Sequence, residues 1–305
     1  MKILVTGGAG YVGVPLVSAL LDAGHQVTIV DNFMFGFESV LHLVSRPNLK
    51  MIKNDVRNED LSYLDDSDVV FHLAAISGYP ECEANPNSAQ RINLDASIRI
   101  SDHLSKDQLL VFASTTSIYG ASGSVSDEET EVAPVSLYGM TKLQAERVIM
   151  QRENSISLRW ATVFGVAPRM RSGLMVNDFV QKAIHEGTLV LYSGDSKRTF
   201  MHVNDSVAGY LFALEHVEKM RGGVYNMGSE ELNYSKRDIA ENIRRYESFE
   251  IVDSSMCDKD VRHFYVSYAK AKSLGFECQY SLDDGIVELI KLYRFFNPHS
   301  FIKAI

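Results

Sequence analysis

The chain has 305 residues, of which 46% are hydrophobic and 23% charged, a balance typical of soluble globular proteins. Its 30 basic and 39 acidic residues give a net charge of −9, which argues against a surface that binds nucleic acid or an anionic membrane. The sequence begins on a predicted strand and lacks an apolar run of about 18 residues, so we expect no signal peptide, no membrane span and a cytoplasmic location.

A glycine-rich turn follows the first predicted strand, residues 2–5, and reads Thr6-Gly7-Gly8-Ala9-Gly10-Tyr11-Val12-Gly13. Glycines between a strand and a helix let the backbone approach a pyrophosphate, and the helix N-terminus offers N–H groups to it. The alternative is a structural turn that binds nothing. We predict that a dinucleotide binds here, in contact with Gly7, Gly10, Tyr11, Val12 and Gly13.

The helix after this turn carries apolar residues at helical spacing and ends at Gly24, and residues 25–30 form a second predicted strand. Asp31 ends this strand, about 20 residues past the glycine turn. A carboxylate at this position accepts hydrogen bonds from both ribose hydroxyls of adenosine and repels a 2′-phosphate. The pattern therefore favours NAD over NADP as the cofactor.

Further strand-like runs lie at residues 69–73, 109–113 and 157–161, separated by helical stretches. This alternation predicts an α/β fold with a Rossmann-type, doubly wound parallel sheet. After Gly165 the pattern loosens, which predicts a smaller, mixed α/β C-terminal lobe for the substrate. We expect the NAD-binding domain to span residues 1–165, completed by about 199–223, and the lobe to comprise residues 166–198 and 224–305.

Hydroxyl-bearing residues follow the strand at 109–113, in the run Ser114-Thr115-Thr116-Ser117. Tyr138 and Lys142 lie one turn apart on a later predicted helix and therefore share a face. The Lys142 ammonium and the positive nicotinamide ring favour the phenolate of Tyr138, which can accept a proton from a substrate hydroxyl. Thr115 is expected to hold that hydroxyl in line with the ring. These three residues are the predicted catalytic residues.

The same Tyr-x-x-x-Lys spacing occurs again at Tyr268 and Lys272. This second pair lies late in the predicted lobe, far from any phosphate-binding turn. We therefore expect a surface helix there, without a catalytic role.

The three cysteines, Cys82, Cys257 and Cys278, are widely spaced and are expected to be reduced thiols. The nine histidines show no paired ligand spacing. The sequence therefore predicts no metal site.

These motifs together resemble the extended short-chain dehydrogenase/reductase family of NAD-dependent nucleotide-sugar epimerases and dehydratases, which includes UDP-glucose 4-epimerases. The resemblance rests on the glycine turn, Asp31-Asn32, Asp55-Val56, His72-Leu73-Ala74-Ala75, Asn93, the run ending in Tyr119-Gly120, and the pair Tyr138 and Lys142. It implies that Asp55 and Val56 contact adenine. It further implies that the cofactor is lined by Asn32, Leu73, Ala74, Ala75, Asn93, Ala113 and Ser114, beside Tyr138 and Lys142.

The second half resembles the same family in residues 158–165, 176–179 and 198–205. The resemblance implies that Asn177 and Arg198 reach the diphosphate of a nucleotide-sugar substrate. Thr162 stands where many members carry asparagine, which leaves open how the sugar is held there. The other residues expected to bind the substrate are Thr115, Thr116, Arg169, Asp260 and Arg262.

Dehydratases of the family carry Asp-Glu directly after the catalytic threonine, where Thr116 and Ser117 stand here. Hydroxyls of high pKa cannot replace those carboxyl groups, so we expect no dehydration. The predicted function is oxidation of a nucleotide sugar at C4 and return of the hydride to the opposite face, which is the reaction of a 4-epimerase.

Two alternatives stay open. Residues 161–165, 168–171 and 177–179 also resemble a subgroup that includes GDP-heptose 4-dehydrogenases, in which a second acceptor takes the electrons. A catalytically silent NAD(H)-sensing or scaffold protein can have the same fold. The resemblance further implies a homodimer formed through the helices around residues 84–103 and 136–152.

Overall fold

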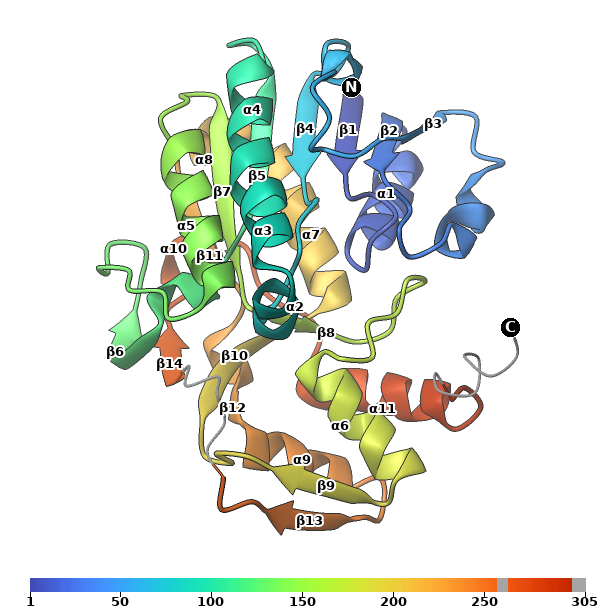
Figure 1. Ribbon diagram of the computed structural model, residues 1–305, viewed down its shortest axis with the longest axis vertical. Helices are drawn as coiled ribbons and strands as arrows, with labels where there is room; N and C mark the ends of the chain where they lie inside the picture. Colours follow the sequence, from blue (N-terminus) through green and yellow to red (C-terminus); the bar gives the residue numbers. More distant parts are fainter. Residues whose placement is uncertain (257–262, 298–305) are drawn as a thin grey trace.

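The computed structural model describes residues 1–256 and 263–297. Its larger part is a parallel sheet of seven strands in the order β11-β7-β5-β4-β1-β2-β3, with helices on both faces (Figure 1). This is the Rossmann-type, doubly wound sheet that the sequence predicts. The strands are β1 Lys2–Thr6, β2 Gln26–Asp31, β3 Leu49–Lys53, β4 Val69–His72, β5 Leu109–Thr115, β7 Ser155–Trp160 and β11 Val224–Met227.

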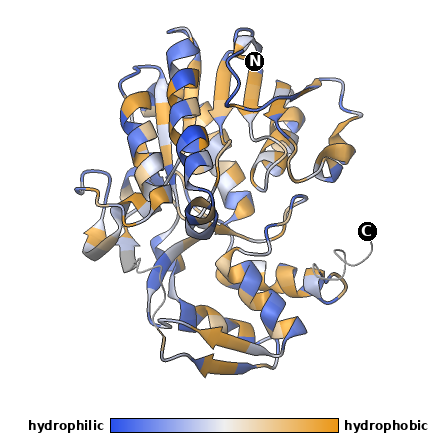
Figure 2. Ribbon diagram, viewed as in Figure 1, coloured by the Kyte–Doolittle hydropathy of each residue, from blue (hydrophilic) through white to orange (hydrophobic). Residues whose placement is uncertain are grey.

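Alternate residues of the strands pack against two helical layers. On one face, Ile3 and Val5 of β1 share a hydrophobic cluster with α1 (Gly13–Asp22) and α7 (Val203–Glu215). On the other face, Leu4 packs in a cluster with α4 (Ala96–His103) and α5 (Leu137–Ile149). Successive side chains of a strand point to opposite faces, so a sheet covered on both sides needs continuous apolar strands. Figure 2 shows these apolar strands between the helices.

A smaller lobe lies beyond the carboxyl ends of the large sheet (Figure 1). It holds a three-stranded sheet in the order β12-β10-β8 and the pairs β13-β9 and β14-β6. Helices α6 (Met175–His185), α9 (Lys236–Arg244) and α11 (Leu282–Tyr293) contribute to a second hydrophobic core. The strands are β6 Ala121–Ser126, β8 Thr162–Phe164, β9 Thr188–Leu191, β10 Lys197–His202, β12 Asn233–Ser235, β13 Glu250–Asp253 and β14 His263–Val266.

Short helical segments connect these elements. They are η1 Glu38–Leu43, η2 Ser62–Leu64, α2 Tyr79–Ala84, α3 Pro86–Ala89, the π-helical η3 Gln90–Asp95, η4 Thr116–Tyr119, α8 Val217–Met220, η5 Glu230–Leu232 and α10 Ala269–Ser273.

The chain passes between the large sheet and the smaller lobe more often than the domain boundaries predicted from the sequence. Val224–Met227, which those boundaries assign to the lobe, forms β11 and pairs with β7 at the edge of the large sheet. Conversely, β8 and β10 pair with each other outside the large sheet, although the boundaries assign them to the NAD-binding domain over most of their length. Pairing of such short strands depends on the tertiary fold more than on their own sequence.

The surface helix predicted at Tyr268 and Lys272 is present as α10, but the predicted exposure is wrong for Tyr268. Tyr268 is only 2% exposed and precedes α10. Its ring packs so closely over Gly228 that a Cβ there would lie 2.6 Å from the ring. The side chain of Lys272 is exposed, whereas that of Tyr268 is buried. Tyr268 and Lys272 therefore present no common face to a ligand.

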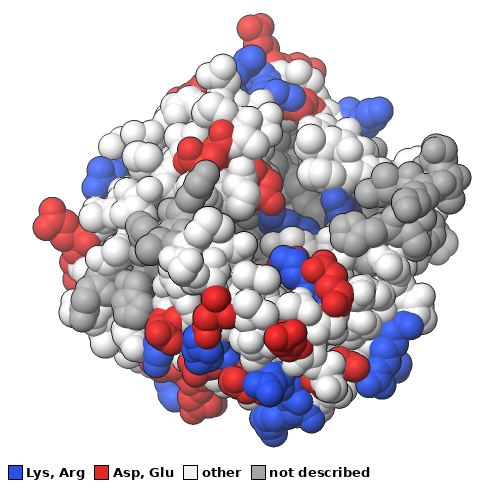
Figure 3. All heavy atoms as spheres, turned by 60° about the horizontal axis from the view of Figure 1, so that its bottom comes forward, with Lys and Arg blue, Asp and Glu red and all other residues white. Residues whose placement is uncertain are grey.

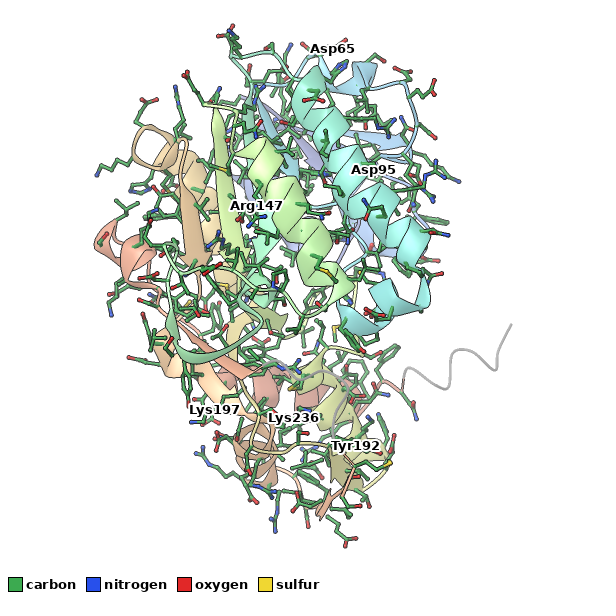
Figure 4. All side chains as sticks on the ribbon, turned by 60° about the vertical axis from the view of Figure 1, so that its left-hand side comes forward. Asp65, Asp95, Arg147, Tyr192, Lys197 and Lys236 are labelled. Carbon is green, nitrogen blue, oxygen red and sulfur yellow. The ribbon has the colours of Figure 1, made fainter. Side chains whose placement is uncertain are left out.

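The two helices expected to form a homodimer lie side by side. α4 and α5 contact each other, and the exposed residues Asp95 and Arg147 mark the outer surface of this pair (Figure 4). The homodimer stays a prediction. Among the described residues, no helix is both long and apolar enough to cross a bilayer.

Candidate active site

The predicted cofactor-binding segments after β1, β2 and β4 lie at one edge of the large sheet. Thr6 at the end of β1 is in register with Val30 of β2 and with His72 of β4. The carboxyl ends of these strands therefore lie together, at the edge where parallel sheets bind ligands. Figure 3 views the molecule with the bottom of Figure 1 turned forward. This face is hollowed near its centre, and Lys and Arg side chains lie in the hollow.

The glycine turn has a backbone that fits a bound dinucleotide. Gly7 has φ +71°, and a Cβ there would lie 2.8 Å from the backbone N of Ala74. A Cβ on Gly13 would collide with the carbonyl oxygen of Gly7. The backbone N–H groups of Tyr11 and Val12 have no acceptor in the part of the chain that the structure describes. Both lie at the N-terminus of α1, where an anion is favoured.

Asp31 is fixed by two backbone hydrogen bonds at the end of β2. Its carboxylate accepts hydrogen bonds from the backbone N of Ala9 at 3.1 Å and of Phe33 at 2.8 Å. Phe33 has φ +54°, which turns the chain sharply after β2. The carboxylate is thereby held between the glycine turn and the next loop, where the ribose of a dinucleotide is expected.

The protein should bind NADP about 100-fold more weakly than NAD, because a 2′-phosphate would meet the fixed carboxylate of Asp31. Asp31→Asn keeps an oxygen acceptor but removes the charge, so the preference should narrow by about tenfold or more. Calorimetric titration of both nucleotides into parent and variant measures this. Equal affinity of the parent for NAD and NADP contradicts the role given to Asp31.

The predicted adenine contact Asp55 already has protein partners. Arg57 donates to it from Nε and from Nη2, each at 2.8 Å, and Asn32 Nδ2 donates at 3.1 Å. The Arg57 guanidinium holds the pKa of the Asp55 carboxyl well below its usual range. Val56 beside it is buried. The adenine contacts of Asp55 and Val56 stay predictions.

A buried chain of hydrogen bonds shapes the loop after β4. Ser97 donates to the carbonyl of Asn93 at 2.8 Å and therefore accepts from Nε2 of His72, at 2.9 Å. His72 Nδ1 then accepts from Thr6 Oγ1 at 2.6 Å, and Thr6 accepts from the backbone N of Ala74 at 3.3 Å. Burial lowers the pKa of His72 to about 3, so the histidine is neutral, as this arrangement requires. The loop is thereby held beside the glycine turn.

Asn93 bonds the protein backbone, and the cofactor contact predicted for it stays a prediction. It is fully buried in η3. Its Oδ1 accepts from the backbone N of Ile76 at 2.8 Å, and its Nδ2 donates to the carbonyl of Ile76 at 2.9 Å. The oxygen and the nitrogen of the Asn93 side-chain amide therefore both hold the loop after β4.

Two buried hydroxyl residues end β5. Thr115 Oγ1 accepts from the backbone N of Ser117 at 3.1 Å, which leaves its own O–H to donate elsewhere. Ser114 Oγ has no hydrogen-bond partner within the described ranges. A buried hydroxyl without a partner is costly, so Ser114 fits a site that a bound molecule completes.

Tyr138 lies in the first turn of α5, which Ser136 caps through its side chain. Burial raises the pKa of the Tyr138 phenol above its usual 10.0, and the hydroxyls of Ser77 and Thr115 lower it. The guanidinium of Arg171 lowers it further. The structure thus brings Tyr138 next to Thr115, as predicted, and next to Ser77, which sequence reasoning missed, with the charge of Arg171 within electrostatic reach.

Lys142 is buried one turn further along, with its Nζ 3.9 Å from the centroid of the Phe112 ring. No carboxylate or carbonyl in the described part of the chain accepts a hydrogen bond from it. Burial lowers the pKa of Lys142 to about 7, and the charge of Glu146 opposes this effect. A buried ammonium without an acceptor fits a site that hydroxyls of a bound cofactor complete.

Glu146 is itself paired in the core. Arg159 of β7 donates to it from Nη2 at 2.7 Å, and Ser157 donates at 2.8 Å. Arg159 also donates to the hydroxyl of Tyr119 at 2.8 Å. This buried ion pair anchors the helix that carries Lys142 to the sheet.

The loop between β8 and α6, residues 165–171, comes from the lobe and meets the glycine turn. The Tyr11 hydroxyl donates to the carbonyl of Gly165 at 2.7 Å. Asn177 is fully buried, accepts from the backbone N of Gly165 at 3.1 Å and donates to the carbonyl of Arg171 at 3.0 Å. Asn177 therefore holds this loop, and the diphosphate contact predicted for it stays a prediction.

The two arginines of this loop point in different directions. The guanidinium of Arg169 lies over the ring of Phe35, 4.5 Å from its centroid, at the loop after β2. Arg171 donates to the carbonyl of Ser77 at 2.9 Å and to Glu81 at 3.2 Å, at the segment after β4. No local spacing could have identified Arg171, because Ser77 and Glu81, which it contacts, lie 94 and 90 residues earlier in the sequence.

Three other residues predicted to bind the substrate differ in exposure. Thr116 is buried and donates to the carbonyl of Trp160 at 3.1 Å, and Arg198 is buried on β10. Thr162 is partly exposed at the start of β8. Asp260 and Arg262 lie outside the described residues.

Cys82 and Cys278 are free thiols, and Cys257 lies outside the described residues. No three His, Cys, Asp or Glu side chains are placed to hold a metal ion in residues 1–256 and 263–297.

The sequence matches the model of the NAD dependent epimerase/dehydratase family over residues 3–228. The chain belongs to this family. It is 32% identical over 248 residues to the uncharacterized UDP-glucose epimerase YtcB of Bacillus subtilis. This alignment covers 76% of this chain and 78% of that protein. It is 29% identical over 315 residues to UDP-glucuronic acid decarboxylase 1 of Arabidopsis thaliana, covering 96% and 70% respectively.

Solved structures of similar proteins have the same fold. The UDP-glucuronic acid 4-epimerase from Bacillus cereus, in complex with UDP-glucuronic acid and NAD, is 26% identical with a TM-score of 0.85 and covers 96% of this chain and 99% of its own. MoeE5 in complex with UDP-glucuronic acid and NAD is 26% identical with a TM-score of 0.84 and the same coverage. Family, fold and NAD as the cofactor are thus confirmed.

Proposed function

We propose that the protein is a 4-epimerase of UDP sugars. It takes a hydride from C4 and a proton from the C4 hydroxyl, and it returns the hydride to the opposite face. The observation that carries this proposal is the cluster of Thr115, Tyr138 and Lys142 at the end of β5, on the sheet edge that also carries the glycine turn and Asp31. The 4-epimerase among the similar structures supports it.

Each residue of the cluster has its own task. The hydroxyls of Thr115 and Ser77 adjoin the Tyr138 phenol and orient the C4 hydroxyl of the sugar. Tyr138 accepts the proton of that hydroxyl and gives it back once the sugar has turned. When bound, NAD supplies the hydride acceptor and a positively charged ring. Burial raises the pKa of Tyr138 and the charge of Arg171 lowers it. We assign Lys142, one turn further along the same helix, as a second cation that stabilises the phenolate.

The surroundings of Tyr138 favour a sugar that carries a carboxylate. The charge of the Arg171 guanidinium lies within electrostatic reach of the phenol, and Thr116 and Ser117 are hydroxyl residues where a carboxylate would repel an anion. A guanidinium matches the geometry of a carboxylate and pairs with it strongly. The two neighbours in complex with UDP-glucuronic acid support a UDP-uronic acid as the substrate.

Decarboxylation is a second candidate, favoured by the UDP-glucuronic acid decarboxylases that align with 96% of this chain. Oxidation at C4 turns the C6 carboxylate of a uronic acid into that of a β-keto acid. Such an acid loses carbon dioxide and takes up a proton at C5. The same Tyr138 cluster would serve the C4 steps of either reaction.

A panel of UDP-, GDP- and dTDP-linked sugars, including UDP-glucuronic acid, tests the proposal, with products followed by NMR and carbon dioxide release. A sugar inverted at C4 with all its carbons supports the 4-epimerase, whereas a UDP-pentose with released carbon dioxide supports the decarboxylase. A 4-keto product with net cofactor reduction favours the dehydrogenase. NAD binding without any turnover favours the sensing or scaffold protein. Loss of water would contradict the expectation for Thr116 and Ser117.

A further inference from the structure

The loop at residues 165–171 crosses the sheet edge at which the cofactor binds. Tyr11 of the glycine turn holds its root through the carbonyl of Gly165, at 2.7 Å. Arg169 reaches the loop after β2, and Arg171 reaches the segment after β4. In the large sheet, β2 and β4 flank β1 on opposite sides. The loop therefore spans the end of β1, where the pyrophosphate of a dinucleotide is expected.

Phe35 contributes nothing to the hydrophobic core. Its side chain is 68% exposed, as much as that of its neighbour Met34 at 67%. The guanidinium of Arg169 lies over its ring, 4.5 Å from the centroid. A cation–π contact at such an exposed site is weak, so it biases the position of the loop and does not hold the fold together.

Arg169 keeps several donors for a ligand. One of its N–H groups donates to the carbonyl of Met170, and no acceptor in residues 1–256 and 263–297 takes the others. Its charge lies within electrostatic reach of Asp31 at the adenosine end. Burial lowers the pKa of Arg169, yet a guanidinium stays charged at physiological pH. Arg169 can therefore donate to an anionic oxygen of a bound dinucleotide.

The contacts at the other side of the loop can also open. Arg171 and Glu81 form their ion pair at 3.2 Å with side chains 28% and 50% exposed, so water reaches both. Next to Arg169, Pro168 borders a cavity of about 310 Å³ whose wall includes residues of α1 and α7. The side-chain contacts of Arg169 and Arg171 are thus partly exposed, whereas Tyr11 and buried Asn177 hold the backbone of the loop at Gly165 and Arg171.

We propose that Phe35 and Arg169 form a clasp that closes this loop over bound NAD and slows its release. Phe35 shields the adenosine end, and Arg169 offers its N–H donors to the cofactor. The clasp keeps the cofactor in place from one turnover to the next. This role differs from the substrate contact predicted for Arg169 from the sequence. It rests on NAD as the cofactor and not on which sugar reaction the protein catalyses.

The rate at which NAD leaves the protein tests the clasp without any substrate. Protein loaded with isotope-labelled NAD is diluted into excess unlabelled NAD, and the bound label is followed. Phe35→Ala and Arg169→Ala should each release NAD about tenfold faster than the parent. Arg169→Lys keeps the charge but loses the planar group and should give an intermediate rate. Met34→Ala, equally exposed and adjacent, is the matched control and should release NAD at the parent rate.

The double variant decides whether the two residues act together. In a single clasp, Phe35→Ala with Arg169→Ala releases NAD no faster than either single variant, whereas independent residues have multiplicative effects. Multiplicative effects overturn the proposal, as do parent-like rates in both single variants. Unchanged NAD release with a raised KM for a nucleotide sugar in Arg169→Ala also overturns it, because Arg169 would then be a substrate ligand. Release rates stay measurable even if every sugar in the panel fails to react.

Discussion

Tyr138→Phe is expected to lower kcat by about 100-fold or more while NAD stays bound, because only the group that accepts the substrate proton is lost. The ring keeps its packing at the start of α5. Thr115 and Ser77, whose hydroxyls adjoin the phenol, remain in place. Steady-state kinetics with the sugar that gives the highest turnover measures the loss, and calorimetry with NAD measures retained binding.

Tyr268→Phe is the matched control, because the sequence contains the Tyr-x-x-x-Lys spacing twice. The Tyr268 hydroxyl is buried and has no hydrogen-bond partner among the residues that the structure describes. Its removal should therefore leave kcat close to that of the parent. A fully active Tyr138→Phe together with an inactive Tyr268→Phe would show that the second pair is the catalytic one.

Lys142→Met is expected to lower kcat by about 100-fold or more and, at the same time, to stabilise the protein at pH 6 in the absence of NAD. Burial lowers the pKa of Lys142 from 10.5 to about 7, so folding disfavours its ammonium. Methionine has a similar length and no charge. Glu146 keeps Arg159 as its partner, at 2.7 Å. The free energy of unfolding should rise by about 1–3 kcal/mol at pH 6.

This gain should shrink as the pH rises. At pH 6 the lysine is charged in the folded and in the unfolded chain, so the folded state bears the full cost of the buried charge. Between about pH 7 and 10.5 the folded state loses its proton first, and the cost fades until parent and variant converge. Denaturant unfolding at several pH values measures both proteins. A pH-independent difference, or a variant less stable than the parent at pH 6, contradicts a buried ammonium at Lys142.

The central strands of the large sheet could be predicted because they are covered on both faces and are therefore continuous apolar runs. β4, for example, is buried at every position from Val69 to His72. The edge strand β3, Leu49–Lys53, was missed because it is largely exposed and carries two lysines. β11 was assigned to the wrong part because its partner β7 lies far earlier in the chain.

In the site, the positions of the glycine turn and of Asp31 at strand ends could be predicted, because they follow continuous apolar strands at a characteristic spacing. The protein partners of buried polar residues could not, because the tertiary fold sets them. Asn93 and Asn177 are fully buried and bond the backbone of loops, and their contacts with cofactor and substrate stay predictions. Arg171 was missed because Ser77, which brings it to the site, lies 94 residues earlier in the chain.

Incubation with UDP-glucuronic acid deuterated at C4 tests the proposed epimerisation most directly. If one hydride is removed and returned within a single complex, the product is the 4-epimer and retains deuterium at the inverted C4. Tyr138→Phe should slow the appearance of this product by the same factor as kcat. A product that has lost the deuterium, or a new product that retains it at a C4 that has not been inverted, would contradict the 4-epimerase.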